Sequence, residues 1–302
     1  MLSRRRSPAY ADRHVRVLAI VSMLVVAGPA VAYGYRDAKV RDALADAGFE
    51  SIADRVAAVS LPTVLVGRWV LDRAPRVRGS SRLGGQPDLP ARARWPHCRG
   101  QAQTFLGQVR LSDLPMDAGP LRAHGGVLLF FTHVRMESPG YGLWAGRCTT
   151  VLHAREGAAL TRTRPPRGAR LLRLRPAEMR FRMRPDIPDT DLSLDRLAAP
   201  LSDIRLAGRQ LERWWGIEQA LHRRPTLLQH RLLGHIRSPN GGSSCWERTQ
   251  RRRGAWRHLF TIGLDYRVGF EVADGGRLQI AIPPGDLRSG RFDRVCGIFD
   301  SA

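Results

Sequence analysis

The stretch from Ser81 to Val134 most constrains the fold, because its motifs return in weaker form in the second half of the chain. The matching pairs are R-L-G-G at 82–85 with R-L-L-G at 231–234, T-F-L-G-Q-V-R-L at 104–111 with H-L-F-T-I-G-L-D at 258–265, and G-G-V-L-L-F-F-T at 125–132 with G-G-R-L-Q-I-A-I at 275–282. Similar motifs in the same order predict an internal duplication, with pseudo-repeats over about 67–200 and 201–302.

Strand patterns dominate these repeats. Apolar and β-branched runs bounded by Gly, Pro and Asp predict strands at Phe105–Leu111 and Val127–Val134. The unbroken apolar run from Val127 to Phe131 indicates a strand covered on both faces. Further strands are expected at Leu172–Arg175, Met179–Arg184, His258–Asp265 and Arg277–Ile282. The fold class is therefore α+β, with mixed or antiparallel sheets and few helices.

Two regions have a helical pattern. The segment Ser202–Leu221 places its apolar residues on one wide face, and we expect both Trp214 and Trp215 in the core. Residues 36–59 read as two short helices, the first ending at Gly48. Ser51 and Asp54 have the spacing of a capping box for the second helix.

The N-terminal segment has the pattern of a membrane anchor. Residues 1–16 carry five arginines against one aspartate, and the uncharged run Val17–Ala32, extended to Tyr35, approaches the roughly 20 residues that span a bilayer as a helix. The basic flank predicts a cytoplasmic N-terminus and a domain outside the membrane. A signal peptide cleaved near Ala32, giving a secreted protein, is the alternative.

These patterns divide the chain into four parts. They are a basic cytoplasmic tail at 1–16, an anchor or signal peptide at 17–35, a helical spacer at 36–66 and the α+β domain at 67–302. The apolar run Leu61–Val66 is too short for a second membrane pass, so we interpret it as the end of the spacer, docked on the domain.

Several motifs resemble the YwqG-like family of uncharacterised domains. They are R-L-G-G-Q-P-D-L-P, W-P-H-C, F-L-G-Q-V-R-L-S-D-L-P, H-R-L-L-G-H, W-R-H-L-F-T-I-G-L-D, G-R-L-Q-I-A-I-P-P-G-D-L and R-F-D-R-V-C-G-I-F-D, in the family's order, over roughly 75–300. The resemblance implies a duplicated α+β fold and supplies no activity. The residues that carry it are Gly84, Gly85, Pro87, Trp95, Pro96, Phe105, Gln108, His230, Leu233, Gly234, Asp265, Asp286 and Phe292.

Two positions depart from the family pattern. Cys296 stands where the family often has an aromatic residue, and Ile262 stands where it often has glutamine. The second departure weakens the idea that Gln108 and a repeat-related glutamine form a shared site.

The four cysteines follow the repeat. Cys98 and Cys148 are 50 residues apart, and Cys245 and Cys296 are 51 apart. This spacing favours one disulfide in each half, Cys98–Cys148 and Cys245–Cys296, in an oxidising compartment. Four buried free thiols are the alternative.

No motif of known catalytic or metal chemistry is present. The nine histidines form no compact cluster or H-E-x-x-H motif, so we expect no metal and no cofactor. Asp265, Asp286 and Asp293 could supply a carboxylate pair for acid–base chemistry, although turn and cap roles are the simpler interpretation. An enzyme with a dispersed site is therefore the second hypothesis, and a pocket holding His230 or His235 beside an aspartate would support it.

The formal net charge of +22 comes almost entirely from arginine, since Lys39 is the only lysine. We predict that one sheet face presents Arg173, Arg175, Arg180, Arg182 and Arg184 to an anionic target. Outside the membrane, lipid headgroups or an envelope polymer fit better than nucleic acid; a solvated face is the alternative.

The leading hypothesis is a non-enzymatic, membrane-anchored domain that binds a protein partner at the cell envelope. A polyanion or nucleic-acid binder is a further alternative.

Overall fold

The computed structural model describes six stretches of the chain: 27–134, 148–189, 200–223, 229–237, 256–272 and 275–300. For residues 27–36 it describes the backbone alone. No helix in these stretches is long and apolar enough to cross a membrane. The predicted anchor at 17–35 lies outside them except for its last residues, which begin a helix.

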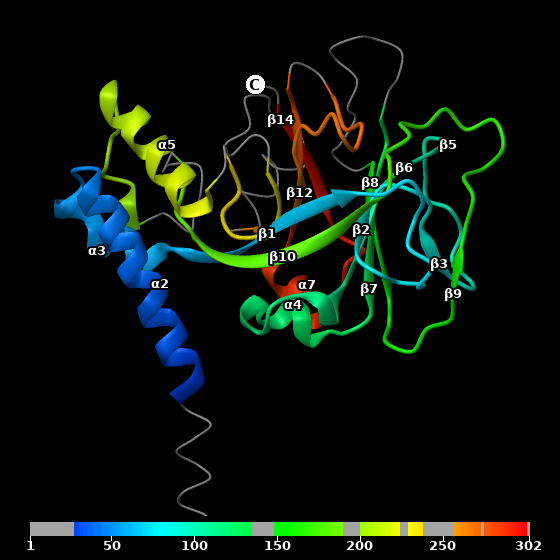
Figure 1. Cartoon of the computed structure of the whole chain (residues 1–302), viewed down its shortest axis with the longest axis horizontal. Helices are drawn as coiled ribbons and strands as arrows, with labels where there is room; N and C mark the ends of the chain where they lie inside the picture. Colours follow the sequence, from blue (N-terminus) through cyan, green and yellow to red (C-terminus); the bar gives the residue numbers. More distant parts are fainter. Residues whose placement is uncertain are drawn as a thin grey trace, which may run out of the picture.

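A single antiparallel sheet organises the fold (Figure 1). Within the described residues it has ten strands in the order β14-β13-β12-β11-β1-β10-β2-β6-β7-β8. The strands are β1 Leu61–Val70, β2 Arg82–Leu83, β6 Thr104–Arg110, β7 Val127–Thr132, β8 Thr149–Ala154, β10 Ala177–Asp186, β11 His230–Leu233, β12 Arg257–Ile262, β13 Arg277–Ile282 and β14 Cys296–Asp300. Two small sheets pair β3 Asp88–Pro90 with β9 Leu160–Arg162, and β4 His97–Cys98 with β5 Gln101–Ala102.

The helices are few and short, which confirms the α+β class with one large antiparallel sheet. They are α2 Ala27–Asp46, α3 Ala53–Val59, α4 Pro120–Ala123, α5 Arg209–His222 and α7 Pro284–Ser289, with 3-10 turns at Glu50–Ile52, Leu111–Asp113 and Met116–Ala118. In Figure 1, α2, α3 and α5 gather at one end of β1 and β10, and α4 and α7 lie together below the sheet.

Strand β1 holds the centre of the sheet. It pairs with β10 along its whole length, from Leu61 opposite Asp186 to Val70 opposite Ala177, and with β11 on its other side. The interpretation of Leu61–Val66 as the end of a spacer was therefore wrong, and the expected domain boundary at residue 67 falls inside a strand. The run is apolar because its alternate residues Val64 and Val66 belong to the main core of the sheet, not because it docks on a finished domain.

The core confirms the strongest strand prediction. All six residues of β7 are buried. Leu128 and Phe130 belong to the main core, whereas Leu129 and Phe131 pack on the opposite face with Trp95. Phe130 stacks on Phe260 of β12 with ring centroids 4.4 Å apart. This contact joins the two halves of the chain in one core.

A second core lies between α2, α3 and α5. Trp214 is fully buried, its ring meets Phe49 edge-on at 5.6 Å, and its indole nitrogen donates to the carbonyl of Pro188 at 3.0 Å. Trp215 is 48% exposed, so only the first tryptophan of the pair belongs to the core. Helix α5 begins at Arg209, seven residues later than expected, because Gly208 precedes it with a φ of 53° that no right-handed helix contains.

Two further local predictions were wrong. Residues 172–175 form no strand, because the carbonyl of Leu174 accepts from Gly85 and the amide of Arg175 donates to Val268, so this segment bonds to two loops. The capping box also fails: Ile52 occupies the cap position of α3 and makes no side-chain hydrogen bond to it. Gly48, with φ of 77°, does end α2 as predicted.

Candidate functional site

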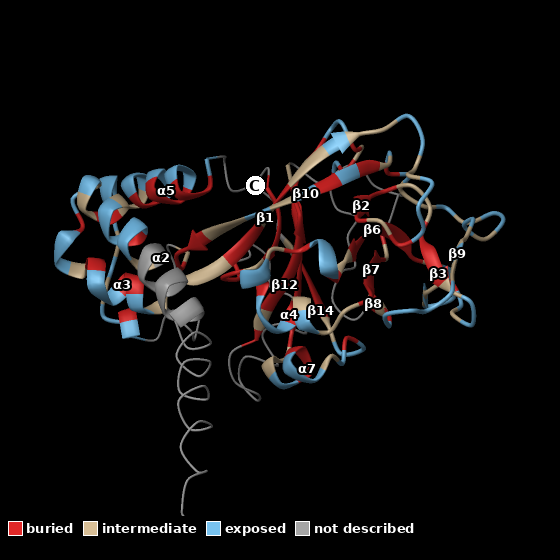
Figure 2. Ribbon diagram, turned by 60° about the horizontal axis from the view of Figure 1, so that its bottom comes forward, coloured by how far each residue is buried: buried red, intermediate tan, exposed pale blue. Residues whose placement is uncertain are grey.

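A groove of about 760 Å³ runs along the outer face of β1 and β10 and ends at the C-terminus of α5. We call it the β1–β10 groove. In Figure 2 the two strands carry intermediate and exposed stretches, whereas β6, β7, β12 and β14 are mostly buried. The lining residues are Leu65, Val66, Gly67, Arg68, Trp69, Leu71, Glu178, Arg180, Arg182, Arg184, His222, Arg223, Gln229 and His230.

Strand register explains the composition of the groove floor. Residues directly opposite each other in an antiparallel pair share a face, and every second residue of a strand returns to it. The opposed pairs that line the groove are Leu65 with Arg182, Gly67 with Arg180, and Trp69 with Glu178, whereas Arg184 lies opposite the buried Thr63. A row of mostly apolar residues from β1 therefore lies beside a row of arginines from β10.

The groove arginines are not neutralised by the protein. Among the described residues, the only salt bridge of Arg180 is a loose one, 3.9 Å to Glu178, and the Arg180 side chain is 80% exposed. Within the same part of the chain, Arg184 donates only to the carbonyl of the adjacent Met183, at 3.1 Å. Neither Arg182 nor Arg223 has a side-chain partner among the described residues. The groove thus presents several guanidinium groups that are open to an anion.

Behind one end of the groove lies a buried ionic hub centred on Asp186. Its carboxylate lies 3.0 Å from Arg231, 2.5 Å from Arg237 and 3.2 Å from the ring of His222, and it accepts a hydrogen bond from the backbone of His235 at 2.7 Å. Burial alone would raise the pKa of Asp186, but the charges of Arg237 and Arg231 and the hydrogen bond from His222 hold this pKa well below its usual range. The hub fixes β10 to β11 and to the last turn of α5.

His222 connects this hub to the groove. Its Nε2 lies 3.2 Å from both Asp186 and the carbonyl of Pro185, and both are acceptors, so Nε2 carries the proton. Its Nδ1 is buried without a hydrogen-bond partner. His222 is therefore held in place by Asp186 at the point where α5 closes the groove.

Asp88 forms a second hub in the other half of the chain. Its carboxylate binds Arg82 and Arg162, each at 2.8 Å, and the amide of Gln108 at 3.1 Å. Burial raises the pKa of Asp88, but the hydrogen bonds from the two arginines outweigh it and lower this pKa to about 2. Gln108 also accepts from the backbone of Asp88 at 3.0 Å, so this glutamine is a structural element of the hub.

The structure brings together one of the expected His–Asp pairs. Nε2 of His230 lies 2.9 Å from the carboxylate of Asp265, which also binds Arg68. The other ring nitrogen, Nδ1, accepts from the backbone of Gly263 at 3.2 Å. Both nitrogens of His230 are occupied, and the side chain is 3% exposed. His230 therefore has no nitrogen left to act as a general base, and the pair orders the turn that begins at Asp265.

The other candidate carboxylates do not form a catalytic pair. Asp286 lies in α7 and binds Arg291 at 2.9 Å and Arg294, whereas Asp293 is exposed. The backbone amide of His235 donates a hydrogen bond to the Asp186 carboxylate, while Nε2 of its ring lies 3.0 Å from the carbonyl oxygen of Val59. Within the described ranges, no group of three or more His, Cys, Asp or Glu residues could hold a metal ion.

The predicted arginine face is only partly formed. Arg180, Arg182 and Arg184 share one face of β10 and line the groove. Arg173 and Arg175 are exposed in the non-strand segment before β10 and do not line it. Neither Trp69 nor Arg223 was identified from the sequence as a groove residue. Trp69 could have been found from its alternate spacing with Leu65, but the first part of β1 was interpreted as a spacer and not as a strand.

Most of the family-motif residues have structural roles. Gly84 and Gly85 both have positive φ, and a side chain at Gly84 would collide with the backbone at Leu174. Leu233 and Gly234 have positive φ at the corresponding place, where β11 ends. The remaining residues contribute contacts of the core or of turns: Trp95 donates to the Gln103 carbonyl, Phe105 packs on Phe131, Phe292 meets His124, and Pro87 accepts from Thr163. Pro96 accepts from the backbone of Gln103 at 2.9 Å.

The first disulfide is confirmed. Cys98 and Cys148 are bonded, with their Cα atoms 5.4 Å apart, which ties the β4–β5 hairpin to the start of β8. Cys245 lies outside the described residues, so its pairing with the buried Cys296 stays a prediction.

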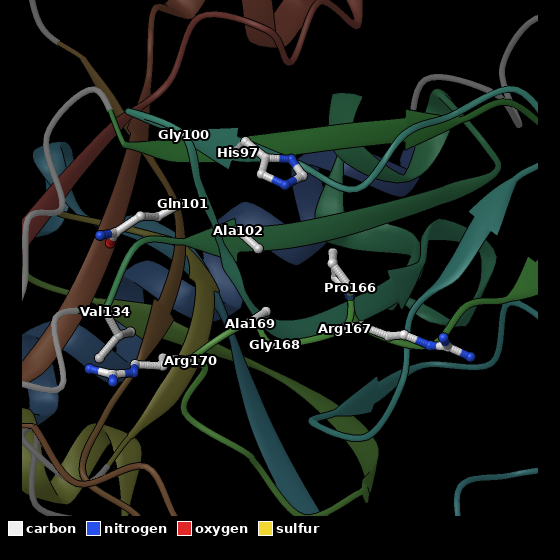
Figure 3. Close-up of a pocket in the computed structure, with 10 residues that line it drawn as sticks. All are labelled: His97, Gly100, Gln101, Ala102, Val134, Pro166, Arg167, Gly168, Ala169 and Arg170. Carbon is white, nitrogen blue, oxygen red and sulfur yellow. The ribbon is translucent and has the colours of Figure 1, made fainter.

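A smaller cavity of about 350 Å³ lies beside this hairpin. Figure 3 shows Gln101 and Arg170 at one end of it and Arg167 at the other. His97, which also lines it, bonds to the carbonyl of Trp95 at 2.7 Å. The two arginines diverge, and none of the described residues that line this space has an acidic or nucleophilic side chain, so the β1–β10 groove is the better candidate site.

Fold and groove together define the class: an α+β domain built on one antiparallel sheet, with a basic groove over its two central strands. The family profile described as a domain of unknown function (DUF1963) matches residues 81–300, and the chain belongs to this family. No curated protein matches the chain. The matched region does not include β1, although this strand lies between β10 and β11 and forms half of the groove floor.

Proposed function

We propose that this chain is a membrane-anchored, non-enzymatic binding domain that holds a partner protein at the cell envelope through the β1–β10 groove. The observation that carries the proposal is a concave site lined by Arg180, Arg182 and Arg223, to which the described residues supply no strong counter-charge. Unneutralised guanidinium groups side by side repel one another and gain from an anionic ligand.

The proposed anchor is the uncharged segment 17–35, with the arginine-rich tail at 1–16 in the cytoplasm and the domain outside. Secretion after cleavage near Ala32 would leave the same domain outside the cell. In either arrangement the exposed arginines would add contacts to anionic lipid headgroups or an envelope polymer.

We also propose that the domain arose by duplication, as the YwqG-like resemblance implies. Strand order supports this: β2, β6, β7 and β8 follow β10 on one side, and β11, β12, β13 and β14 follow β1 on the other. Each set begins with a buried arginine, Arg82 or Arg231, bound to a buried aspartate. Two positions with positive φ follow each arginine: Gly84 and Gly85 after Arg82, and Leu233 and Gly234 after Arg231. Leu233 adopts this conformation without being a glycine, which is uncommon.

Binding of the purified full chain, in detergent micelles, to immobilised poly-L-glutamate tests the proposed function. We expect association that weakens steeply with salt, and at least a tenfold loss of affinity when Arg180, Arg182 and Arg223 are all replaced by glutamine. The matched control replaces Arg73, Arg92 and Arg94, which are exposed and outside the groove, by glutamine. An equal loss in the control, or no binding by the unaltered chain, would remove the groove from the proposal.

A further inference from the structure

We infer that the ligand of the β1–β10 groove is an extended acidic segment of a partner protein, with carboxylates at alternate residues and an aromatic residue at one end. This inference rests on the proposed function and specifies its ligand. It follows from the spacing of the arginines, from the glycine in the floor of the groove and from the residues at its two ends.

The spacing of the arginines matches an extended peptide. Arg180, Arg182 and Arg184 occupy alternate positions of one strand, so their Cα atoms follow at intervals of about 6.8 Å. Strand β10 pairs with β1 over ten residues, which holds this row straight. An extended peptide repeats its own side chains at the same interval, so carboxylates at alternate residues can each meet one arginine.

The floor of the groove favours an extended chain that lies close to the sheet. Gly67, opposite Arg180, adds no side chain to the floor, so a ligand backbone can approach the sheet closely at its middle.

The two ends of the groove give the ligand a direction. At one end Glu178 stands opposite Trp69, whose side chain is 71% exposed. A ligand carboxylate would be repelled there, whereas an aromatic side chain can pack on the indole. At the other end Arg184 and Arg223 add positive charge near the end of α5. We therefore expect the aromatic residue at the Trp69 end and the acidic residues toward α5.

Two synthetic peptides of identical composition test the inference. The first is acetyl-Tyr-Ser-Glu-Ser-Glu-Ser-Glu-amide, and the second has the same residues in the order Tyr-Ser-Ser-Ser-Glu-Glu-Glu. Fluorescence anisotropy with the full chain in micelles should show at least tenfold tighter binding of the alternating peptide. Arg182→Gln should abolish this preference, and Trp69→Ala should weaken binding of the alternating peptide at least threefold. Both side chains are exposed, so neither change disturbs the core.

Each other result overturns the inference in a different way. Equal affinity for the two peptides, with groove-dependent binding of poly-L-glutamate, would reject the extended acidic ligand and leave the proposed function standing. Two phosphate probes, vesicles containing phosphatidylglycerol and an oligothymidine, are compared with the alternating peptide. Tighter binding of either probe, if it is lost in Arg182→Gln, would identify a phosphate ligand instead. Failure of every anionic probe would reject both proposals.

Discussion

Nη1 of Arg231 lies 3.0 Å from Oδ2 of Asp186, and both side chains are buried where β10, β1 and β11 meet at the centre of the sheet. Asp186 binds Arg237 as well, and Arg237 also lies 2.9 Å from the buried carboxylate of Glu218, so two carboxylates face two buried guanidinium groups. An uncompensated charge in this position would be costly, because the surrounding protein excludes the water that would otherwise solvate it. The hub therefore couples the packing of the C-terminal strands to the strand that carries the groove arginines.

Replacing Asp186 by asparagine should be among the most damaging conservative changes in this chain. It keeps the size of the side chain and removes the charge that pairs with Arg231 and, together with Glu218, with Arg237. The expected loss is about 3–5 kcal/mol in the free energy of unfolding. Denaturant unfolding of the purified protein measures it. The control is Asp203→Asn, which breaks an exposed pair with Arg55 and should leave the unfolding midpoint nearly unchanged. Similar effects of the two substitutions would contradict a special role for the buried hub.

Asp88 predicts a defined loss of stability in acid. Its pKa of about 2 in the folded protein lies below the value near 3.9 that an unfolded chain has, so its stabilisation is complete above pH 4. That contribution, roughly 2 kcal/mol, should disappear as the pH falls from about 4 to 2. Unfolding free energies measured across this range in the wild type and in Asp88→Asn check it. The variant should be less stable at pH 7 and should show a shallower decline in acid; parallel curves would show that other groups cause the decline.

Gly234 should tolerate no side chain. Its φ is 90°, and a Cβ atom would collide with the Asp186 carboxylate and reach within 3.0 Å of Thr63. We expect Gly234→Ala to lower the free energy of unfolding by more than about 3 kcal/mol, since strain and overlap add together. Gly100→Ala is the matched control, because Gly100 has φ of 78° with open space around it, and should cost about 1 kcal/mol. Thermal or denaturant unfolding of both variants separates the cost of the overlap from that of the backbone conformation.

The Cys98–Cys148 bond predicts both stability and location. It closes a loop of 50 residues, so the double replacement by serine should lower the free energy of unfolding by about 4 kcal/mol on the chain-entropy model. In intact cells, a membrane-impermeant thiol reagent should label these cysteines only after reduction, as mass spectrometry would show. Thiols that react without reduction, and only after lysis, would place the domain in the cytoplasm and restore nucleic acid as a candidate partner.

Local patterns determined much of this protein. The apolar run at Val127–Phe131 specified a strand buried on both faces, and the alternation at Met179–Arg184 placed three arginines on one face of β10. Both patterns depend on the side chains of consecutive residues, which any strand displays in the same way. The cysteine spacing likewise indicated the disulfide that closes the first half.

Tertiary pairing decided the site. Leu61–Val66 contains nothing local that distinguishes a central strand from a docked spacer, and its role follows from pairing with β10, more than a hundred residues further along the chain. The same pairing places Trp69 and Gly67 beside the arginines and excludes Arg173 and Arg175. Register between distant strands is set by packing of the whole core, so the sequence alone identified the basic residues, and the fold selected which of them form a groove.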